Sequence, residues 1–120
     1  FLVAKECGVH QNYKNKVLKA NDIATMSTGK RLGHPVRSIK NPYTKEYFKL
    51  EYSNISDEEL EAYGRGALYR AAVEGDEKTG CFLAGQIAGM VNKEQTAKEI
   101  IEEIFTQAED VLKGATKWVK

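Results

Sequence analysis

The segment Gly80-Cys81-Phe82-Leu83-Ala84-Gly85-Gln86-Ile87-Ala88-Gly89 is small, apolar and uncharged in a chain that is otherwise densely charged. Its three glycines and two alanines leave the backbone with little side-chain cover, so another backbone or a flat ligand can approach closely. Gln86 is its only strongly polar side chain. Two interpretations remain open: the segment packs tightly under flanking helices, or it forms part of a binding site.

Composition limits the classes of protein to consider. A chain of 120 residues is expected to form one globular unit around one hydrophobic core. With 18 Lys and Arg against 17 Asp and Glu, the net charge of +1 favours neither nucleic acid nor an anionic membrane as a partner. No apolar run approaches the roughly 18 residues of a membrane span, and no signal-peptide layout is present. We therefore expect a soluble, cytoplasmic protein.

Candidate chemical groups are few. Cys7 and Cys81 lie far apart, and neither His10 nor His34 belongs to a ligand motif, so no metal site is expected. A Ser-His-Asp set, a Walker loop and a dinucleotide fingerprint are not apparent. A cysteine in an apolar segment is more often an inert core residue than a nucleophile, and a loop histidine is usually solvated. The residues alone name no reaction, and no catalytic residue is assigned.

Local patterns predict a mainly helical α+β fold with one short β-hairpin near residues 23–40. Residues 1–4 resemble the end of a strand whose beginning is missing. A short helix is expected over 12–20, and another begins at Asn41-Pro42. The aromatic residues of that second helix could stack on nucleic acid, but interrupting glutamates favour core packing.

A third helix is predicted to begin at Ser56. Ser56 can cap the amide of Glu59 while Glu59 reaches back to the Ser56 amide, and Gly75 is placed to end the helix. Gly64 and Gly66 are anomalous inside this pattern, because each glycine costs up to ~1 kcal/mol in a helix interior. Either a close neighbour or a break in the helix must offset that cost.

The longest helix is predicted from about 93 to 113, opened by a variant capping box of Asn92 and Gln95. Its apolar stripe runs from Ala97 to Leu112 on one face. Because a large aliphatic stripe in water makes a chain prone to associate, we expect a homo-oligomer that pairs these faces.

Five short motifs occur in an order that resembles a known family. Together they resemble the C-terminal part of the flavin-dependent enoyl-acyl carrier protein reductases, the type II enzymes of bacterial fatty-acid synthesis, which are close relatives of the nitronate monooxygenases. The resemblance covers essentially the whole chain. The motifs are Asn12-Tyr13-Lys14, Gly33-His34-Pro35-Val36-Arg37-Ser38-Ile39-Lys40-Asn41, Gly66-Ala67-Leu68, Val73-Glu74-Gly75-Asp76 and Ala84-Gly85-Gln86-Ile87-Ala88-Gly89.

The resemblance implies a parent enzyme built as a (β/α)8 TIM barrel that holds FMN at the C-terminal face of its strands. Residues 1–120 would be a single C-terminal segment, in which 1–22 form the end of a barrel strand and the following helix. Residues 23–120 would form the hairpin and a helical cap. Because the phosphate-binding turn and barrel strands would lie upstream, the fragment alone is expected to be inactive and not to bind FMN tightly.

The same resemblance implies that Leu83, Ala84, Gly85 and Gln86 bind the cofactor and line the pocket for nicotinamide and acyl substrate. A flat ring needs close backbone approach and a hydrogen-bonding amide, which Gly85 and Gln86 would supply. Reductases of the family often have serine and methionine where this chain has Cys81 and Leu83. The ring contact at Leu83 would then come from a branched aliphatic group instead of a thioether.

The reaction implied is reduction of FMN by NADH or NADPH, followed by hydride transfer to the trans-2 double bond of an enoyl thioester carried by acyl carrier protein. One alternative is an FMN-dependent nitronate monooxygenase of the 2-nitropropane dioxygenase type. Another is a non-catalytic helical interaction module. The Gln-Ile-Ala-Gly and Gly-His-Pro-Val-Arg runs look more like the reductase than the monooxygenase.

Overall fold

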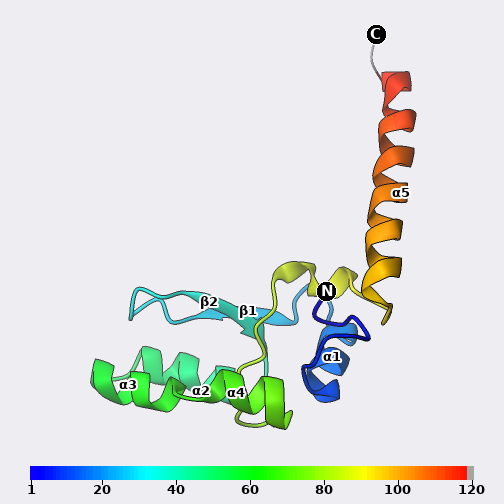
Figure 1. The fold of residues 1–120 in the computed structure, drawn as a ribbon. Helices are drawn as coiled ribbons and strands as arrows, with labels where there is room; N and C mark the ends of the chain where they lie inside the picture. The colour runs from blue at the N-terminus through cyan, green and yellow to red at the C-terminus, as the bar shows by residue number, and fades with distance from the viewer. Residues whose placement is uncertain (119–120) are drawn as a thin grey trace. The chain divides into compact units, whose positions relative to one another are not determined.

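The computed structural model describes residues 1–118 and confirms a mainly helical chain with an antiparallel hairpin (Figure 1). Its contacts divide the chain into two compact units, whereas the chain length predicted one. One unit comprises residues 8–93, and the other comprises residues 1–7 together with the chain from Glu94 onward. The elements are α1 (Gln11–Leu18), β1 (Thr25–Thr28), β2 (Val36–Ile39), α2 (Pro42–Glu51), α3 (Asp57–Gly64), α4 (Ala67–Tyr69), the π-helical turn η1 (Arg70–Glu74), the 3-10 turn η2 (Gln86–Met90), α5 (Ala97–Ala115) and the 3-10 turn η3 (Thr116–Trp118).

The hairpin pairs β1 with β2 in antiparallel register, with Thr25 opposite Ile39. Its first strand is two residues shorter at the start than predicted, because the chain before it forms a turn. Glu51, buried at the end of α2, accepts hydrogen bonds from the backbone N–H of Gly29 at 3.2 Å and of Arg31 at 2.8 Å. The hairpin turn is therefore held against α2.

The core of the larger unit lies where α2 packs against the hairpin and α3, which Figure 1 shows on one side of the two strands. Asn41 and Thr44 form a reciprocal capping box at the start of α2, and Pro42 occupies its first turn. Tyr43 and Tyr47 are buried in this core, which confirms core packing for two of the three aromatic residues of this helix. The third, Phe48, is exposed.

The predicted third helix begins as expected, with the reciprocal box of Ser56 and Glu59, but it is broken in the middle. It ends at Gly64, and Gly66 adopts a left-handed φ of 74° before the chain resumes as α4 and η1. Of the two explanations for these glycines, the break is the correct one, because a left-handed residue cannot continue a right-handed helix. Gly75 ends η1 with a φ of 64°.

The longest helix begins at Ala97 and not at 93, and the predicted Asn92 cap is wrong. Thr96 and Glu99 form the box instead: the Glu99 N–H donates to Thr96 Oγ1 at 3.2 Å, and the Thr96 N–H donates to the Glu99 carboxylate at 2.7 Å. Threonine with glutamate three residues on is the stronger capping pair. Residues 1–4 form turns where a strand end was predicted.

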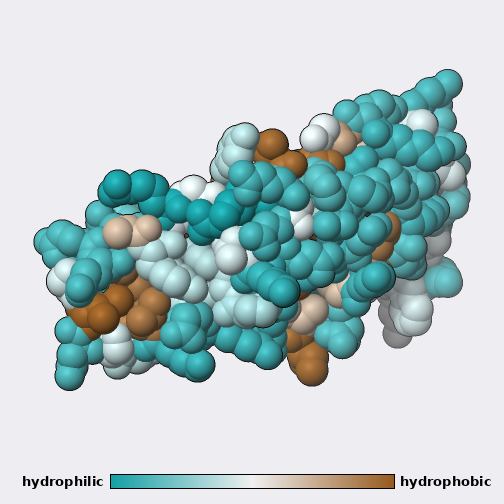
Figure 2. All heavy atoms as spheres, turned by 90° about the horizontal axis from the view of Figure 1, so that it is seen from below, coloured by the Kyte–Doolittle hydropathy of each residue, from teal (hydrophilic) through white to brown (hydrophobic). Residues whose placement is uncertain are grey.

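Helix α5 shows the predicted apolar stripe, but no residue of the helix is buried. Exposure along the stripe rises from 47% at Ile101 to 72% at Phe105. Apolar side chains elsewhere also reach the surface, where brown patches interrupt a largely hydrophilic exterior (Figure 2). No part of the described residues buries the α5 stripe, so its pairing with a second copy of the chain stays a prediction.

Candidate functional site

The segment that follows Gly80 runs antiparallel along β2 and extends the hairpin. The Ile39 N–H donates to the Phe82 carbonyl at 2.8 Å, and the Ala84 N–H donates to the Arg37 carbonyl at 3.1 Å. Phe82 is fully buried, with its ring edge-on to Tyr13 at a centroid distance of 5.0 Å. The buried Phe82 ring therefore anchors the segment to the core.

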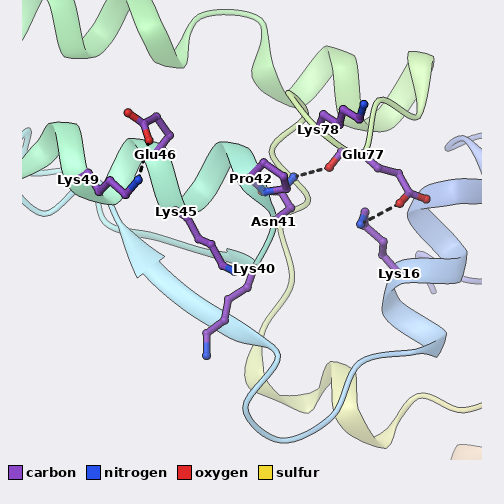
Figure 3. A pocket seen from close by; sticks show the side chains of 9 residues that line it. All are labelled: Lys16, Lys40, Asn41, Pro42, Lys45, Glu46, Lys49, Glu77 and Lys78. Carbon is purple, nitrogen blue, oxygen red and sulfur yellow. Dashed lines mark hydrogen bonds and ion pairs between the residues drawn. The ribbon is translucent and has the colours of Figure 1, made fainter.

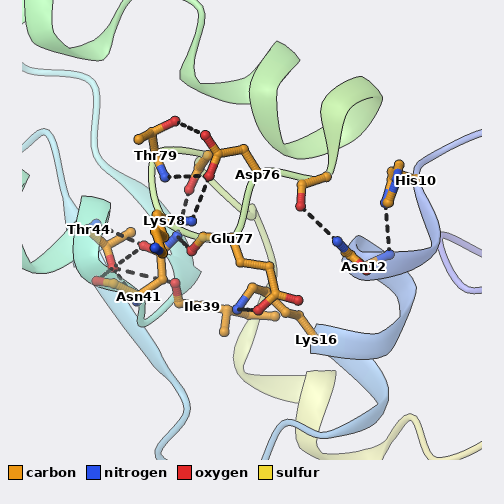
Figure 4. Close-up of polar contacts among 12 residues, drawn as sticks. His10, Asn12, Lys16, Ile39, Asn41, Thr44, Asp76, Glu77, Lys78 and Thr79 are labelled. Carbon is orange, nitrogen blue, oxygen red and sulfur yellow. Dashed lines mark hydrogen bonds and ion pairs between the residues drawn. The ribbon is translucent and has the colours of Figure 1, made fainter.

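Gly80 anchors the start of the segment by close packing. Its N–H donates to the Asp76 carbonyl at 2.9 Å, and its own carbonyl accepts from Asn41 Nδ2 at 2.7 Å. A Cβ at this position would lie 2.5 Å from the Asp76 oxygen and 2.8 Å from Ala71 Cα. Figure 4 shows how Asn41 joins the start of α2 to the loop before Gly80. Tight packing is thus the correct interpretation at Gly80.

Gly85 and Gln86 are different, because both are exposed. A Cβ at Gly85 would meet no atom within 4 Å, and among residues 1–118 neither the Gly85 N–H nor the Gln86 carboxamide has a hydrogen-bond partner. The turn η2 is anchored, because Ala88 is buried and Gly89 packs against the Asn21 backbone. The result is an accessible backbone edge with one free amide donor and one free carboxamide.

A pocket of about 230 Å³ is bordered by Leu83, which precedes Gly85 by two residues. The pocket is smaller than the roughly 300 Å³ of a typical small-molecule site, so it admits part of a ligand only. Its other borders come from the hairpin, α2, α3, α4 and the start of the central segment. They are Thr28, Gly29, His34, Val36, Tyr43, Tyr47, Gly64, Ala67, Leu68 and Cys81.

Two tyrosines and the cysteine that border the pocket are held in their neutral forms. Burial raises the pKa of Tyr43, of Tyr47 and of the Cys81 thiol. Burial also raises the pKa of Tyr13 to about 12, although its hydroxyl donates to the Leu83 carbonyl at 2.7 Å. At neutral pH the tyrosines are hydrogen-bond donors, and Cys81 is a thiol and not an activated nucleophile.

The residues singled out from the sequence are only partly brought together. Leu83 borders the pocket, Ala84 is paired to β2, and Gly85 and Gln86 continue past it as exposed backbone. Sequence reasoning missed His34 as a pocket residue. Its signal was the position two residues before β2, the strand that pairs with the central segment.

Two features are absent from residues 1–118. No helix in that part of the chain is long and apolar enough to cross a membrane. No group of three or more His, Cys, Asp and Glu side chains there is placed to hold a metal ion.

Comparison with known proteins identifies the class. Residues 1–107 match the family model described as nitronate monooxygenase, and the chain belongs to that family. Among solved structures it is similar to FabK from Thermotoga maritima, with 33% identity and a TM-score of 0.93 over 98% of this chain and 37% of FabK. A point mutant of the same FabK matches with 30% identity and a TM-score of 0.82, over 98% of this chain and 35% of the mutant. The chain thus spans little more than a third of the FabK length, and its fold matches a fragment of the FabK TIM barrel.

Proposed function

We propose that the whole protein is an FMN-dependent enoyl-acyl carrier protein reductase. It uses NADH or NADPH to reduce trans-2-enoyl thioesters in bacterial fatty-acid synthesis, in the cytoplasm. The likeness to FabK supports this, and family membership supports the flavin. The observation that carries the proposal is the exposed Gly85–Gln86 edge, which follows the pocket residue Leu83 in the same segment.

The residues present fit one edge of a flavin ring. Open space at Gly85 lets a flat ring lie against the backbone, and the free N–H there can donate a hydrogen bond to a ring acceptor. Gln86 offers a carboxamide that can donate or accept. Leu83, Ala84, Gly85 and Gln86 would therefore hold the ring, as the sequence predicted, while its phosphate would be held elsewhere in the whole protein.

Bound flavin supplies hydride transfer between nicotinamide and the enoyl double bond, and this chain supplies the surroundings. Leu83 and the buried tyrosines keep water from one side of the site. Tyr47 and Tyr43 stay protonated at neutral pH and can donate a hydrogen bond to a polar ligand group. The isolated 120-residue chain is expected to retain no stoichiometric flavin, because it offers the ring edge alone.

A second candidate function is nitronate oxidation, which the description of the matching family favours. The two activities differ in substrate and not in cofactor. Purified whole protein should be yellow and should oxidise reduced nicotinamide when crotonyl thioester is added. Turnover of a nitronate without turnover of the thioester would support the second function instead.

A pair of variants tests the ring edge. Gly85→Val should lower flavin retention by filling the open space, with little effect on stability. Gly8→Val is the matched control, because Gly8 is also exposed and a Cβ added there would meet no atom within 4 Å. Equal flavin content in the two purified variants would contradict the assignment of Gly85 to the flavin.

A further inference from the structure

A buried tyrosine holds the carbonyl of Leu83, two residues before the exposed Gly85. Tyr13, in the first turn of α1, donates its hydroxyl to this oxygen at 2.7 Å, although the two residues lie 70 positions apart in the sequence. Only 2% of Tyr13 is exposed, and its ring packs edge-on against Phe82. The hydroxyl therefore has a fixed position, and the flavin contacts described above give it no role.

This hydrogen bond completes a grip on one peptide unit. A peptide unit is planar and contains the carbonyl of one residue and the N–H of the next. In the unit between Leu83 and Ala84, the carbonyl accepts from Tyr13, and the N–H donates to the Arg37 carbonyl of β2 at 3.1 Å. Because the two groups point in opposite directions in a trans unit, α1 and β2 hold this unit from opposite edges.

Helix α1 is itself anchored, which makes Tyr13 a firm support. Asn12 Nδ2 donates to the Gly75 carbonyl at 3.0 Å. Lys16, one turn further along α1, pairs with the Glu77 carboxylate at 3.3 Å on the loop that follows η1 (Figure 3). Both contacts fix α1 against the chain that leads into the central segment, so Tyr13 projects from a supported helix.

The gripped peptide unit controls the direction of the free N–H at Gly85. That N–H belongs to the next peptide unit, and only the φ and ψ of Ala84 lie between the two planes. No group among residues 1–118 accepts from the Gly85 N–H, so the gripped unit and the turn η2 determine its orientation.

We propose that Tyr13 is a positioning residue for the flavin. By holding the Leu83–Ala84 peptide unit, it keeps the Gly85 N–H in the orientation in which that group can donate to the ring. The inference rests on the proposed function, because that function places the ring at Gly85.

Tyr13→Phe tests the grip, because it removes the hydroxyl and keeps the ring that packs against Phe82. Hydrogen–deuterium exchange of the purified whole protein is measured by mass spectrometry on a peptide that contains residues 82–86. The Ala84 N–H should exchange about threefold to tenfold faster in the variant, since one of the two hydrogen bonds on its peptide unit is lost. Unchanged exchange would overturn the grip, and this readout needs no flavin.

The midpoint potential of the bound flavin tests whether the grip reaches the ring. A hydrogen bond donated to the ring favours its more electron-rich, reduced form. In Tyr13→Phe the affinity for reduced relative to oxidised flavin should therefore fall about threefold to tenfold, which lowers the potential by about 15–30 mV for a two-electron couple. An unchanged potential together with faster Ala84 exchange would overturn the positioning role.

Ser56→Ala is the control for a loss of stability alone, because it removes the cap of α3 and lies outside the gripped unit. Ala84 exchange and the flavin potential should be those of the unaltered protein, and changes equal to those of Tyr13→Phe would overturn the proposal. If Tyr13→Phe fails to fold, as judged by circular dichroism, 3-fluorotyrosine at position 13 replaces it.

The fluorine in that replacement makes the hydroxyl a stronger donor, so Ala84 exchange should slow and the potential should rise. Unchanged values of both would overturn the proposal. If the unaltered whole protein retains no flavin, the proposed function fails, and Ala84 exchange alone decides whether Tyr13 grips the segment.

Discussion

Replacing Gly80 by alanine tests the claim that the central segment is fixed by close packing at its first residue. The added Cβ would meet three backbone atoms at 2.5 to 2.8 Å, contributed by Asp76 and Ala71. Backbone atoms cannot turn aside as a flexible side chain can. Either the overlap persists or the loop before Gly80 moves.

Both outcomes destabilise the fold by a similar amount. An overlap of this kind costs ~1–3 kcal/mol. If the loop moves, the hydrogen bonds of Gly80 to the Asp76 carbonyl and from Asn41 lengthen, and each is worth ~0.5–1.5 kcal/mol. Alanine restricts the unfolded chain and returns ~0.4–1 kcal/mol. The free energy of unfolding should therefore fall by about 1–2 kcal/mol in urea titrations followed by circular dichroism.

Gly85→Ala is the matched control within the same segment. Gly85 has an ordinary φ of −73°, and its Cβ would meet nothing within 4 Å. Its free energy of unfolding should be unchanged or rise by ~0.4–1 kcal/mol. Equal losses of stability in the two variants would refute the different roles given to the two glycines.

Other side chains with defined contacts give further expected outcomes. Asn41→Ala should lower the free energy of unfolding by ~2–3 kcal/mol, because a helix cap and two hydrogen bonds to loop carbonyls are lost. Asn41→Ser should lose less stability, because serine keeps the cap. Equal losses in the two variants would contradict the capping role. Glu51→Gln should lower the free energy of unfolding by ~1–3 kcal/mol in the same titration, because only one of the two backbone N–H groups in the hairpin turn would keep an acceptor. An unchanged free energy of unfolding would mean that these two hydrogen bonds do not stabilise the fold. For Tyr13, the unfolded state deprotonates near pH 10 and the folded state near about 12, so stability should fall as pH rises between these values, and Tyr13→Phe should flatten that slope in unfolding measured against pH. We propose that the chain is dimeric or larger at micromolar concentration through the exposed α5 stripe, and that Ile104→Glu dissociates it in light scattering; a monomer of the unaltered chain would count against this.

Local patterns in the sequence predicted most elements of the fold. The helix start at Asn41, the box at Ser56, the hairpin, and the end at Gly75 depend on hydrogen bonds or φ values within one turn of chain, so neighbouring residues suffice to specify them. One error concerned the start of the longest helix. The prediction placed the cap at Asn92, whereas the structure places it at Thr96, which pairs with Glu99.

The sequence by itself also determined which segment could approach a flat ligand, because only glycine and alanine backbones allow that approach. The tertiary structure alone decided that Gly80 is packed shut while Gly85 is open, since the atoms that block Gly80 come from Asp76 and Ala71 across a turn. It also placed His34 at a pocket and brought the Tyr13 hydroxyl to the Leu83 carbonyl. Those arrangements depend on contacts between residues up to about seventy positions apart, such as Tyr13 with Leu83, and packing free energy, not local hydrogen bonding, selects them.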